Sequence, residues 1–319
     1  MRVLLHQFER AAAFLDLAWR RRASAGKTGL GREAAHWSVA EKHPVVEWQD
    51  HPAVRRHVNT RVSGRPDVNW LECFFQRFGG DGIDCALNLG CGFGDLEEHA
   101  FSTGMVRRFY SLDISSAAVE HCRRRFSGRA AEFEVFDLNH AVLEPERFDA
   151  VFGASVLHHV SALEHLLDEV EKALVPGGWF VFDEYVGPSR FQWRTRQLEV
   201  INELLSALPR RYRRDLRSRC RYKRRVYPNP LDETSRDSPF EAVRSEEILP
   251  LVEARFEVIS RRDYGGALLH PLLDGIAGNF RMDSGDDMRL LFRLLLLEGE
   301  LERAGIIGSD FTSVVARKV

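Results

Sequence analysis

The feature that most constrains this 319-residue chain is a short apolar run that leads directly into three closely spaced glycines. The stretch reads ALNLGCGFGD, from Ala86 to Asp95, with glycines at positions 90, 92 and 94. Glycine has no Cβ and tolerates positive φ, so such a turn can bend sharply and bring its backbone close to a ligand. The pattern predicts a buried strand, a ligand-binding loop and a following helix.

Strands and helices alternate after this loop. Apolar runs end at Asp113 and Asp137, two more follow by residue 183, and amphipathic stretches separate them. This order is typical of a parallel sheet that binds its ligand beyond the carboxyl ends of the strands. With later strands expected at 256–259 and 311–316, we predict an α/β fold: a seven-stranded, mostly parallel, Rossmann-like sheet with helices on both faces.

Two segments fall outside that alternation. Residues 1–75 have helical patterning and many arginines, histidines and tryptophans, and we expect a helical lid or accessory segment there. Residues 76–319 then form the main domain, with a helical, basic insertion after the fifth strand at about 185–245. Helical lids are common over sites that exclude water.

Composition and charge narrow the functional classes. A content of 44% hydrophobic and 29% charged residues predicts a globular protein, and a formal charge of -2 favours neither nucleic acid nor anionic membranes globally. The five cysteines lack metal-type spacing, so we expect reduced thiols and no metal site. Glu9 and Asp16 interrupt any signal-peptide core, and no apolar run is long enough to span a bilayer. A cytoplasmic location is expected.

The loop and the next strand end indicate the ligand class. Asp113, nineteen residues beyond Gly94, can accept hydrogen bonds from two ribose hydroxyls. A dinucleotide loop would place its third glycine at the position of Asp95, and that acid would repel a pyrophosphate. The residues therefore favour an adenosine-type ligand that carries positive charge.

Several motifs agree in order with one known family. They are Leu89–Gly94, Asp113, Phe136–Leu138, Phe148–Val151, Ser155–His159 and Leu174–Gly178. In these motifs the chain resembles the class I S-adenosylmethionine-dependent methyltransferases, closely over residues 84–184 and loosely in the closing strands. The resemblance implies S-adenosylmethionine (SAM) as the cofactor.

The resemblance also implies a set of cofactor-binding residues. They are Asn88, Gly90, Cys91, Gly92, Gly94, Asp113, Ile114, Asp137, Leu138 and Ser155. One position departs from the family, which often carries an acid two residues before the first glycine. Asn88 can still accept a hydrogen bond there but lacks the charge.

Methyl transfer from a sulfonium is an in-line displacement, so a catalyst acts mainly by alignment, with a base when the acceptor is a hydroxyl. Base candidates must lie at the carboxyl edge of the sheet, where His158, His159 and Glu184 are expected. His158 is the first choice, because the unperturbed pKa of histidine lies near neutrality. A purely packing role for the two histidines remains an alternative.

We expect the pocket for the methyl acceptor to be formed by segments that the family members do not share. Tyr185, Arg190 and Trp193 directly follow a ligand-side strand end, and Tyr264 and His270 follow the sixth strand. Aromatic faces and a guanidinium at such a place are typical of a binding loop, although each residue could equally serve packing.

A basic segment stands out in this nearly neutral chain. Residues 210–225 contain ten lysines or arginines and a single acid. Such a segment can bind phosphate, as in RNA or a nucleotide-linked sugar, can attract an anionic membrane, or can be a solvated face that pairs with acids elsewhere.

These patterns together predict a SAM-dependent methyltransferase that acts on an oxygen or nitrogen of a small or glycosylated metabolite. Two alternatives remain open. One is an RNA methyltransferase that uses the basic segment at 210–225, and the other is a SAM-binding protein without catalytic activity.

Overall fold

The protein is described by a computed structural model that covers residues 47–80, 82–218, 221–228 and 240–319, together with Gly31 and Ala34. Most of the predicted N-terminal segment therefore lies outside the described residues. The proposed boundary near residue 75 stays a prediction.

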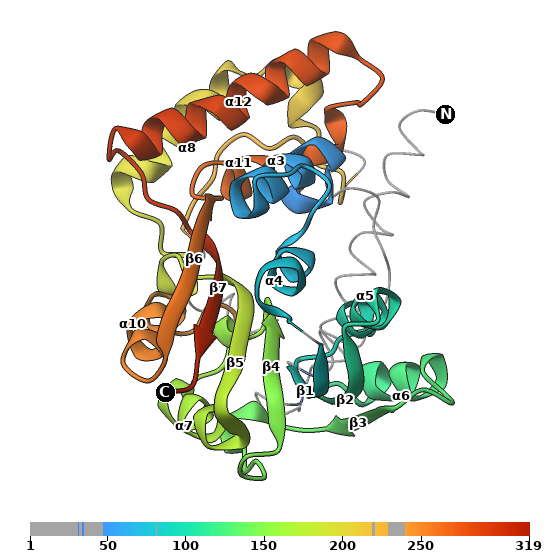
Figure 1. Ribbon diagram of the computed structural model, residues 1–319. Helices are drawn as coiled ribbons and strands as arrows, with labels where there is room; N and C mark the ends of the chain where they lie inside the picture. Colours follow the sequence, from blue (N-terminus) through green and yellow to red (C-terminus); the bar gives the residue numbers. More distant parts are fainter. Residues whose placement is uncertain (1–30, 32–33, 35–46, 81, 219–220, 229–239) are drawn as a thin grey trace.

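A seven-stranded sheet forms the centre of the molecule (Figure 1). Its order is β3-β2-β1-β4-β5-β7-β6, with β1 to β5 parallel and β7 antiparallel to both β5 and β6. The strands are β1 Ile83–Leu89, β2 Val106–Asp113, β3 Ala131–Val135, β4 Phe148–Ala154, β5 Leu174–Tyr185, β6 Glu257–Gly265 and β7 Phe311–Arg317. The predicted fold class is confirmed, and the strand order reverses between β1 and β4, where such sheets bind ligands.

Helices cover both faces of this sheet (Figure 1). One core contains Leu87 and Leu89 of β1 with the leucine face of α7 (Leu163–Ala173) and with α10 (Ile248–Glu253). The opposite core contains Ala86 of β1 with α4 (Trp70–Phe78) and α5 (Asp95–Thr103). Alternate residues of a strand point to opposite faces, which is why neighbours in β1 enter different cores. Helix α6 (Ser116–Arg125) packs along β2 and β3.

A second helical layer lies beyond the carboxyl ends of β5 and β6 (Figure 1). It consists of α3 (Pro52–Ser63), α8 (Thr195–Ala207), α11 (Leu269–Leu273) and α12 (Gly285–Arg303) around one apolar core. Short 3-10 turns connect the elements: η1 Trp48–Asp50, η2 Leu138–His140, η3 Leu157–His159, η4 Ser189–Phe191, η5 Arg210–Arg213, η6 Ser245–Glu247 and η7 Ala277–Asn279. None of the described helices is long and apolar enough to cross a membrane.

The predicted helical insertion is helical only in part. Helix α8 has the expected form, but the described residues beyond Leu208 form the single turn η5 and then irregular or extended backbone up to residue 228. Pro209 cannot continue the helix, because proline lacks an amide hydrogen and clashes with the preceding turn. The dense arginines that follow lie on a strap, not on a helix face.

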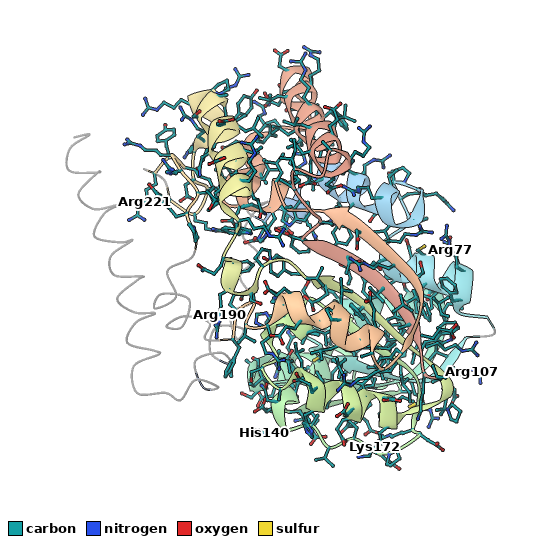
Figure 2. The ribbon with its side chains drawn as sticks, turned by 90° about the vertical axis from the view of Figure 1, so that its left-hand side faces the viewer. Arg77, Arg107, His140, Lys172, Arg190 and Arg221 are labelled. Carbon is teal, nitrogen blue, oxygen red and sulfur yellow. The ribbon has the colours of Figure 1, made fainter. Side chains whose placement is uncertain are left out.

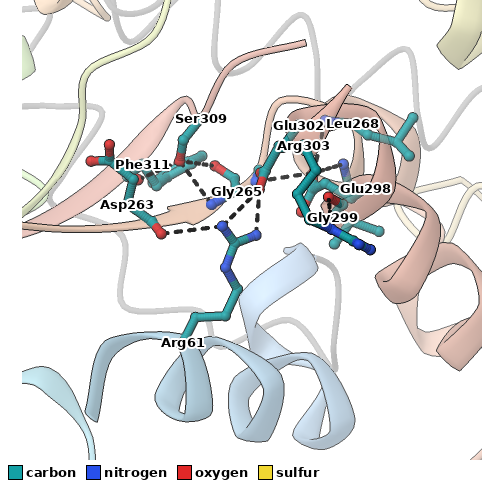
Figure 3. Close-up of polar contacts among 12 residues, drawn as sticks. Arg61, Asp263, Gly265, Leu268, Glu298, Gly299, Glu302, Arg303, Ser309 and Phe311 are labelled. Carbon is teal, nitrogen blue, oxygen red and sulfur yellow. Dashed lines mark hydrogen bonds and ion pairs between the residues drawn. The ribbon is translucent and has the colours of Figure 1, made fainter. Parts of the chain in front are cut away.

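The second layer is pinned to the sheet by a buried carboxyl group (Figure 3). Glu298 of α12 is fully buried, and its Oε1 accepts hydrogen bonds from the backbone N–H groups of Gly266, Leu268 and Leu269. Gly265 has φ +99°, and a Cβ there would lie 2.2 Å from Glu298 Oε2. Only glycine therefore lets β6 end against this carboxyl group.

Replacing Glu298 with glutamine should remove a pH-dependent part of the stability. Burial raises the pKa of Glu298 from 4.5 to about 7. The folded state therefore favours the neutral acid, and this stability is fully present below pH 4.5 and lost as pH rises through about 7. A glutamine stays neutral, so the stability of Glu298→Gln relative to wild type should increase by on the order of 2 kcal/mol between pH 5 and pH 8.

Urea unfolding at the two pH values measures this difference. The matched control is Glu300→Gln, which changes an exposed glutamate of the same helix and should leave the pH dependence as in the wild type. An equal pH dependence in Glu298→Gln and wild type would mean that Glu298 ionises at its ordinary pKa.

Candidate active site

The loop after β1 forms one wall of a cavity of about 420 Å³. Gly90 has φ +72°, and a Cβ there would lie 2.5 Å from Cγ2 of Val156. Gly92 has φ +50°, but a Cβ there would meet no heavy atom within 4 Å, because this glycine faces the cavity. The first glycine is thus required by close packing of the loop against Val156, and the second leaves backbone exposed to a ligand.

Asp113 closes the same loop from the end of β2. Its Oδ2 accepts a hydrogen bond from Gly92 N at 2.8 Å and its Oδ1 accepts one from Ser115 N at 2.8 Å. Burial raises the pKa of Asp113, and these two backbone N–H groups oppose that shift. Each carboxylate oxygen keeps a second lone pair, so the side chain can still accept hydrogen bonds from ribose hydroxyls.

Asp137, at the end of β3, presents an acceptor to the cavity. Its Oδ1 accepts from the backbone and side-chain nitrogens of Asn139, both at 3.0 Å. Its buried Oδ2 accepts no hydrogen bond from the described residues, and the exposed His140 ring has its Nε2 at 3.8 Å from it. A buried acceptor is costly to leave unpaired, so this oxygen fits a ligand that brings a donor, such as the exocyclic amine of adenine.

The remaining cavity wall is mainly apolar. It includes Phe93, Ile114, Phe136, Leu138, Ala154, Val156, Val160 and Phe240. An apolar slot with convergent acceptors from Asp113 and Asp137 fits an adenosine moiety, because it offers flat faces for the base and carboxylates for the ribose and the amine.

Seven of the ten predicted cofactor-binding residues line the cavity. They are Gly90, Gly92, Asp113, Ile114, Asp137, Leu138 and Ser155. The other three do not line it. Cys91 is buried behind the loop, where its backbone N donates to Leu112 O, and Gly94 precedes α5 as its N-cap. The role of all ten toward a cofactor stays a prediction.

Asn88 faces away from the cavity and pairs with an acid that the sequence analysis did not single out. Its Nδ2 donates to Oε1 of Glu97 in α5 at 2.8 Å, and both side chains are buried. Burial raises the pKa of Glu97. An acid at position 88 would face this second carboxyl group, which gives a physical reason for the amide at this position.

The rim of the cavity beyond β4 and β5 is organised by Glu184. This fully buried carboxylate accepts hydrogen bonds from the backbone nitrogens of Val156, Leu157 and Tyr185 at 2.7–2.8 Å, and from Nδ1 of His158. With its oxygens occupied and no exposed surface, Glu184 is placed to hold the η3 turn and to orient His158. The predicted catalytic role of Glu184 stays a prediction.

His158 lies between two carboxylates. Its Nε2 is 3.4 Å from Oε1 of Glu241, opposite the bond to Glu184. Burial disfavours a charged ring, but the two glutamates outweigh this and raise the pKa of His158 from 6.5 to about 10. The ring is therefore protonated at neutral pH and donates from both nitrogens, so it has no lone pair with which to act as the predicted general base.

His159 links this pair to the cavity. It lines the cavity wall, its ring centroid lies 4.0 Å from that of His158, and its Nδ1 is 3.8 Å from Oε2 of Glu241. His158, His159 and Glu241 offer three ligand-type atoms within 4.8 Å of one another, an arrangement that could hold a metal ion. The sequence-based prediction of no metal is not tested by the structure.

Four of the five predicted acceptor-binding residues meet in one aromatic cluster next to His158. Tyr185, Trp193 and His270 pack on one another together with Phe191 and Phe311, with ring centroids 5.0–6.2 Å apart. Tyr264 stacks on Phe311 and donates its hydroxyl to Asp183. Arg190 is half-buried and lies outside this set of ring contacts.

The cluster touches the rim and contains a neutral imidazole. The ring of Tyr185 lies 6.2 Å from that of His158. Burial lowers the pKa of His270 to about 4, so its ring is uncharged at neutral pH. The Nδ1 atom of His270 is buried and has no hydrogen-bond partner among the described residues. The cluster is thus a largely buried group of aromatic rings, and Nε1 of Trp193 also has no hydrogen-bond partner among the described residues.

Three site residues escaped the sequence analysis. Asn139 holds Asp137 and also accepts from Ser161, while Phe240 lines the cavity and Glu241 faces His158. Asn139 follows a predicted strand end and could have been found from its position. Phe240 and Glu241 lie about eighty residues beyond His158, in a segment without periodic signal, and only folding brings them there.

Comparisons with known proteins agree with this geometry. Residues 87–182, from β1 to β5, match the family model described as a methyltransferase domain. A fatty-acid O-methyltransferase of Mycolicibacterium smegmatis is 30% identical over 98 residues, which are 31% of this chain and 36% of that protein. A probable phthiotriol/phenolphthiotriol dimycocerosates methyltransferase 2 of Mycobacterium ulcerans is 27% identical over 162 residues, 48% of this chain and 57% of that protein.

The chain spans between about a third and three fifths of the length of these two curated relatives. A SAM-dependent methyltransferase structure from Mesorhizobium loti is 20% identical and aligns over 74% of this chain and 91% of its own, with a TM-score of 0.44. That likeness is too distant to carry an argument about function.

Proposed function

We propose that this chain, whose residues 87–182 form a class I SAM-dependent methyltransferase domain, methylates an oxygen or nitrogen of a small metabolite with an apolar body. One observation carries the proposal. His158, held between Glu184 and Glu241, stands between the cavity that fits adenosine and the aromatic cluster around Tyr185. Such a place suits a charge-handling group between a methyl donor and its acceptor.

The chain's own residues would hold the cofactor through three contacts. Asp113 would bind the ribose hydroxyls, Asp137 Oδ2 would accept from the adenine amine, and the backbone at Gly92 would lie against the ligand. When bound, SAM supplies a methyl group on a positively charged sulfur. The nearby carboxylates suit that charge better than they would suit a pyrophosphate.

Glu241 is the proposed proton acceptor. As His158 is protonated at neutral pH, its Nε2–H faces Glu241, and the carboxylate is the partner that can take a proton from an acceptor hydroxyl. With SAM bound, methyl transfer to the hydroxyl oxygen would give the methyl ether and S-adenosylhomocysteine, and Glu241 would hold the proton that the hydroxyl releases. Glu184 keeps His158 in place.

The aromatic cluster and the relatives favour an apolar acceptor. Tyr185, Trp193 and His270 contribute aromatic rings and two buried ring nitrogens without partners among the described residues, and the imidazole of His270 is uncharged at neutral pH. Two relatives are named for fatty acids and for phthiotriol dimycocerosates, both lipids. A glycosylated metabolite stays an alternative, since sugars also stack on aromatic rings.

Methyl transfer from labelled SAM tests the proposal. The purified chain would be assayed with a long-chain fatty acid, a hydroxylated quinone and a phenolic glycoside, by measuring S-adenosylhomocysteine. Turnover is expected with the fatty acid or the quinone, which are the two apolar acceptors. A chelator should leave this turnover unchanged if His158, His159 and Glu241 hold no metal ion. Titration calorimetry with SAM and with NADH is the control: binding of NADH alone would overturn the function.

A further inference from the structure

The strap that follows α8 carries a group of outward-facing cations, which we call the basic surface. It consists of Arg210, Arg214, Arg221, Arg224 and Arg225 with two tyrosines, Tyr222 and Tyr227, all of them exposed. Figure 2 shows Arg221 at the edge of the molecule, pointing away from the sheet. The proposed methyl-transfer chemistry uses none of these residues.

Other cations tie the strap to neighbouring elements. Arg217 forms ion pairs with Asp274 and with Glu47, and the Lys223 ammonium donates to the backbone oxygens of Pro271 and Asp274. Asn202 of α8 exchanges two hydrogen bonds with the backbone of Val226. These contacts tie the described part of the strap to α8 and to the end of α11.

The strap also brings the outward residues together. An antiparallel bridge joins Arg214 and Tyr222, and Asp215 N donates to Arg221 O at 3.0 Å. The two halves of the strap therefore lie side by side, and the arginines of both halves share one small area.

The outward arginines differ from most other exposed arginines in their partners. Within the part of the chain that the structure describes, none of the five arginines of the basic surface forms an ion pair. Exposed arginines on other elements are commonly paired, for example Arg108 with Asp84 and Arg289 with Asp286. The basic segment therefore pairs with acids at Arg211 and Arg217, as one of the alternatives predicts, but not at the five arginines of the basic surface.

The two tyrosines give the basic surface an amphipathic character. Tyr222 is 38% exposed and Tyr227 is 64% exposed. The guanidinium of Arg210 lies 4.4 Å from the Tyr222 ring centroid, and that of Arg225 lies 5.6 Å from the Tyr227 centroid. Tyrosine side chains favour the headgroup level of a bilayer, where the ring is half apolar and the hydroxyl stays wet.

From these observations we infer that the basic surface docks the protein onto an anionic lipid surface. Arginines without partner acids bind phosphate and anionic headgroups, and the exposed tyrosines enter the interface beside them. RNA is the competing occupant. It is less well matched, because single-stranded readers need open ring faces for base stacking, and here arginines of the same strap already lie over both rings.

Vesicle co-sedimentation of the full chain tests the inference without SAM or an acceptor, so its outcome is independent of the proposed function. We expect binding to phosphatidylcholine vesicles that contain phosphatidylglycerol, none to phosphatidylcholine alone, and weaker binding as salt increases. The triple variant Arg221→Gln, Arg224→Gln, Arg225→Gln should bind the anionic vesicles more weakly by about fivefold for each arginine, on the order of a hundredfold in all.

The matched control removes three exposed arginines from other elements. Arg107→Gln, Arg124→Gln, Arg262→Gln changes the formal net charge from -2 to -5, as the test variant does, and should keep most of the vesicle binding. Arg107 lies on the side opposite Arg221 (Figure 2). If both triple variants lost vesicle binding equally, the effect would come from net charge alone and the inference would be wrong. Unchanged vesicle binding in the test variant would also overturn it.

Two further readouts separate lipid from RNA. Tyr227→Ser should weaken vesicle binding without changing the charge, because it removes the apolar part of the contact. A gel-shift titration with single-stranded RNA at the same salt should show weaker binding than to anionic vesicles. If the chain bound RNA more tightly than anionic vesicles, and the test variant abolished that binding, RNA and not a lipid surface would be the partner of the basic surface.

Discussion

Asp113→Ala should lower the affinity of the chain for SAM by about tenfold to a hundredfold, as titration calorimetry would measure. The carboxylate can accept two hydrogen bonds from the ribose, and hydrogen bonds to a charged group are worth more than neutral ones. The same side chain holds the loop after β1 through the bonds to Gly92 N and Ser115 N. Its loss therefore removes ligand contacts and loosens the wall that presents them.

A second substitution separates ligand contact from folding. Gly92→Ala adds a Cβ that meets no protein atom within 4 Å and extends into the cavity, so it should weaken SAM binding while leaving the rest of the loop packed. The φ of +50° at this position adds backbone strain of about 1–3 kcal/mol, so thermal unfolding of the variant is measured beside SAM binding. Asp95→Ala, an exposed acid of the same loop, is the control and should keep SAM affinity within about twofold of wild type. Wild-type SAM affinity in both Asp113→Ala and Gly92→Ala would exclude this cavity as the cofactor site.

Glu241→Gln should slow methyl transfer to a hydroxyl acceptor on the order of a hundredfold or more, while SAM affinity changes by less than about threefold. Glutamine keeps the size of the side chain but cannot take the proton that the hydroxyl releases. A carboxylic acid acceptor is already deprotonated at neutral pH, so transfer to a fatty acid should be nearly unaffected by the same variant. Turnover numbers with the two acceptor types measure this contrast.

Variants near Glu241 complete the experiment. His158→Gln should slow both acceptor types, because it removes the cation that lies between Glu184 and Glu241 and disturbs the rim. Glu246→Gln changes an exposed acid of the same segment and should keep full turnover. If Glu241→Gln slowed hydroxyl and carboxylic acceptors equally, the side chain would position the acceptor and would not accept its proton.

The cofactor half of the molecule could largely be predicted from local sequence. In a parallel sheet the carboxyl ends of successive strands meet at one edge, so Gly92, Asp113 and Asp137 were expected together and do line one cavity. Residues 87–182 match a methyltransferase-domain family model, which agrees with the domain family predicted from the same motifs. Such predictions are possible because each strand and loop is recognisable from neighbouring residues, and because the parallel topology places the strand ends at one edge.

The acceptor side could be predicted only in part. Tyr185, Trp193, Tyr264 and His270 were chosen from two segments far apart in sequence, and the fold brings them into one aromatic cluster. The charge state of His158 was not predictable, because it depends on Glu241 and on burial. The partner of Asn88 was likewise hidden, since Glu97 lies on the next helix and meets it only after packing.

By itself the sequence determined the elements and their order, because hydrophobic period, glycine and proline act over a few neighbouring residues. It thereby determined the sheet, the glycine loop after β1 and the acids at the ends of β2 and β3. The tertiary structure alone decided which charges face one another, such as Glu184, His158 and Glu241. It also decided which arginines of the strap pair with acids. Electrostatic interactions and burial depend on distance in space, and residues about eighty positions apart acquire that distance only when the chain folds.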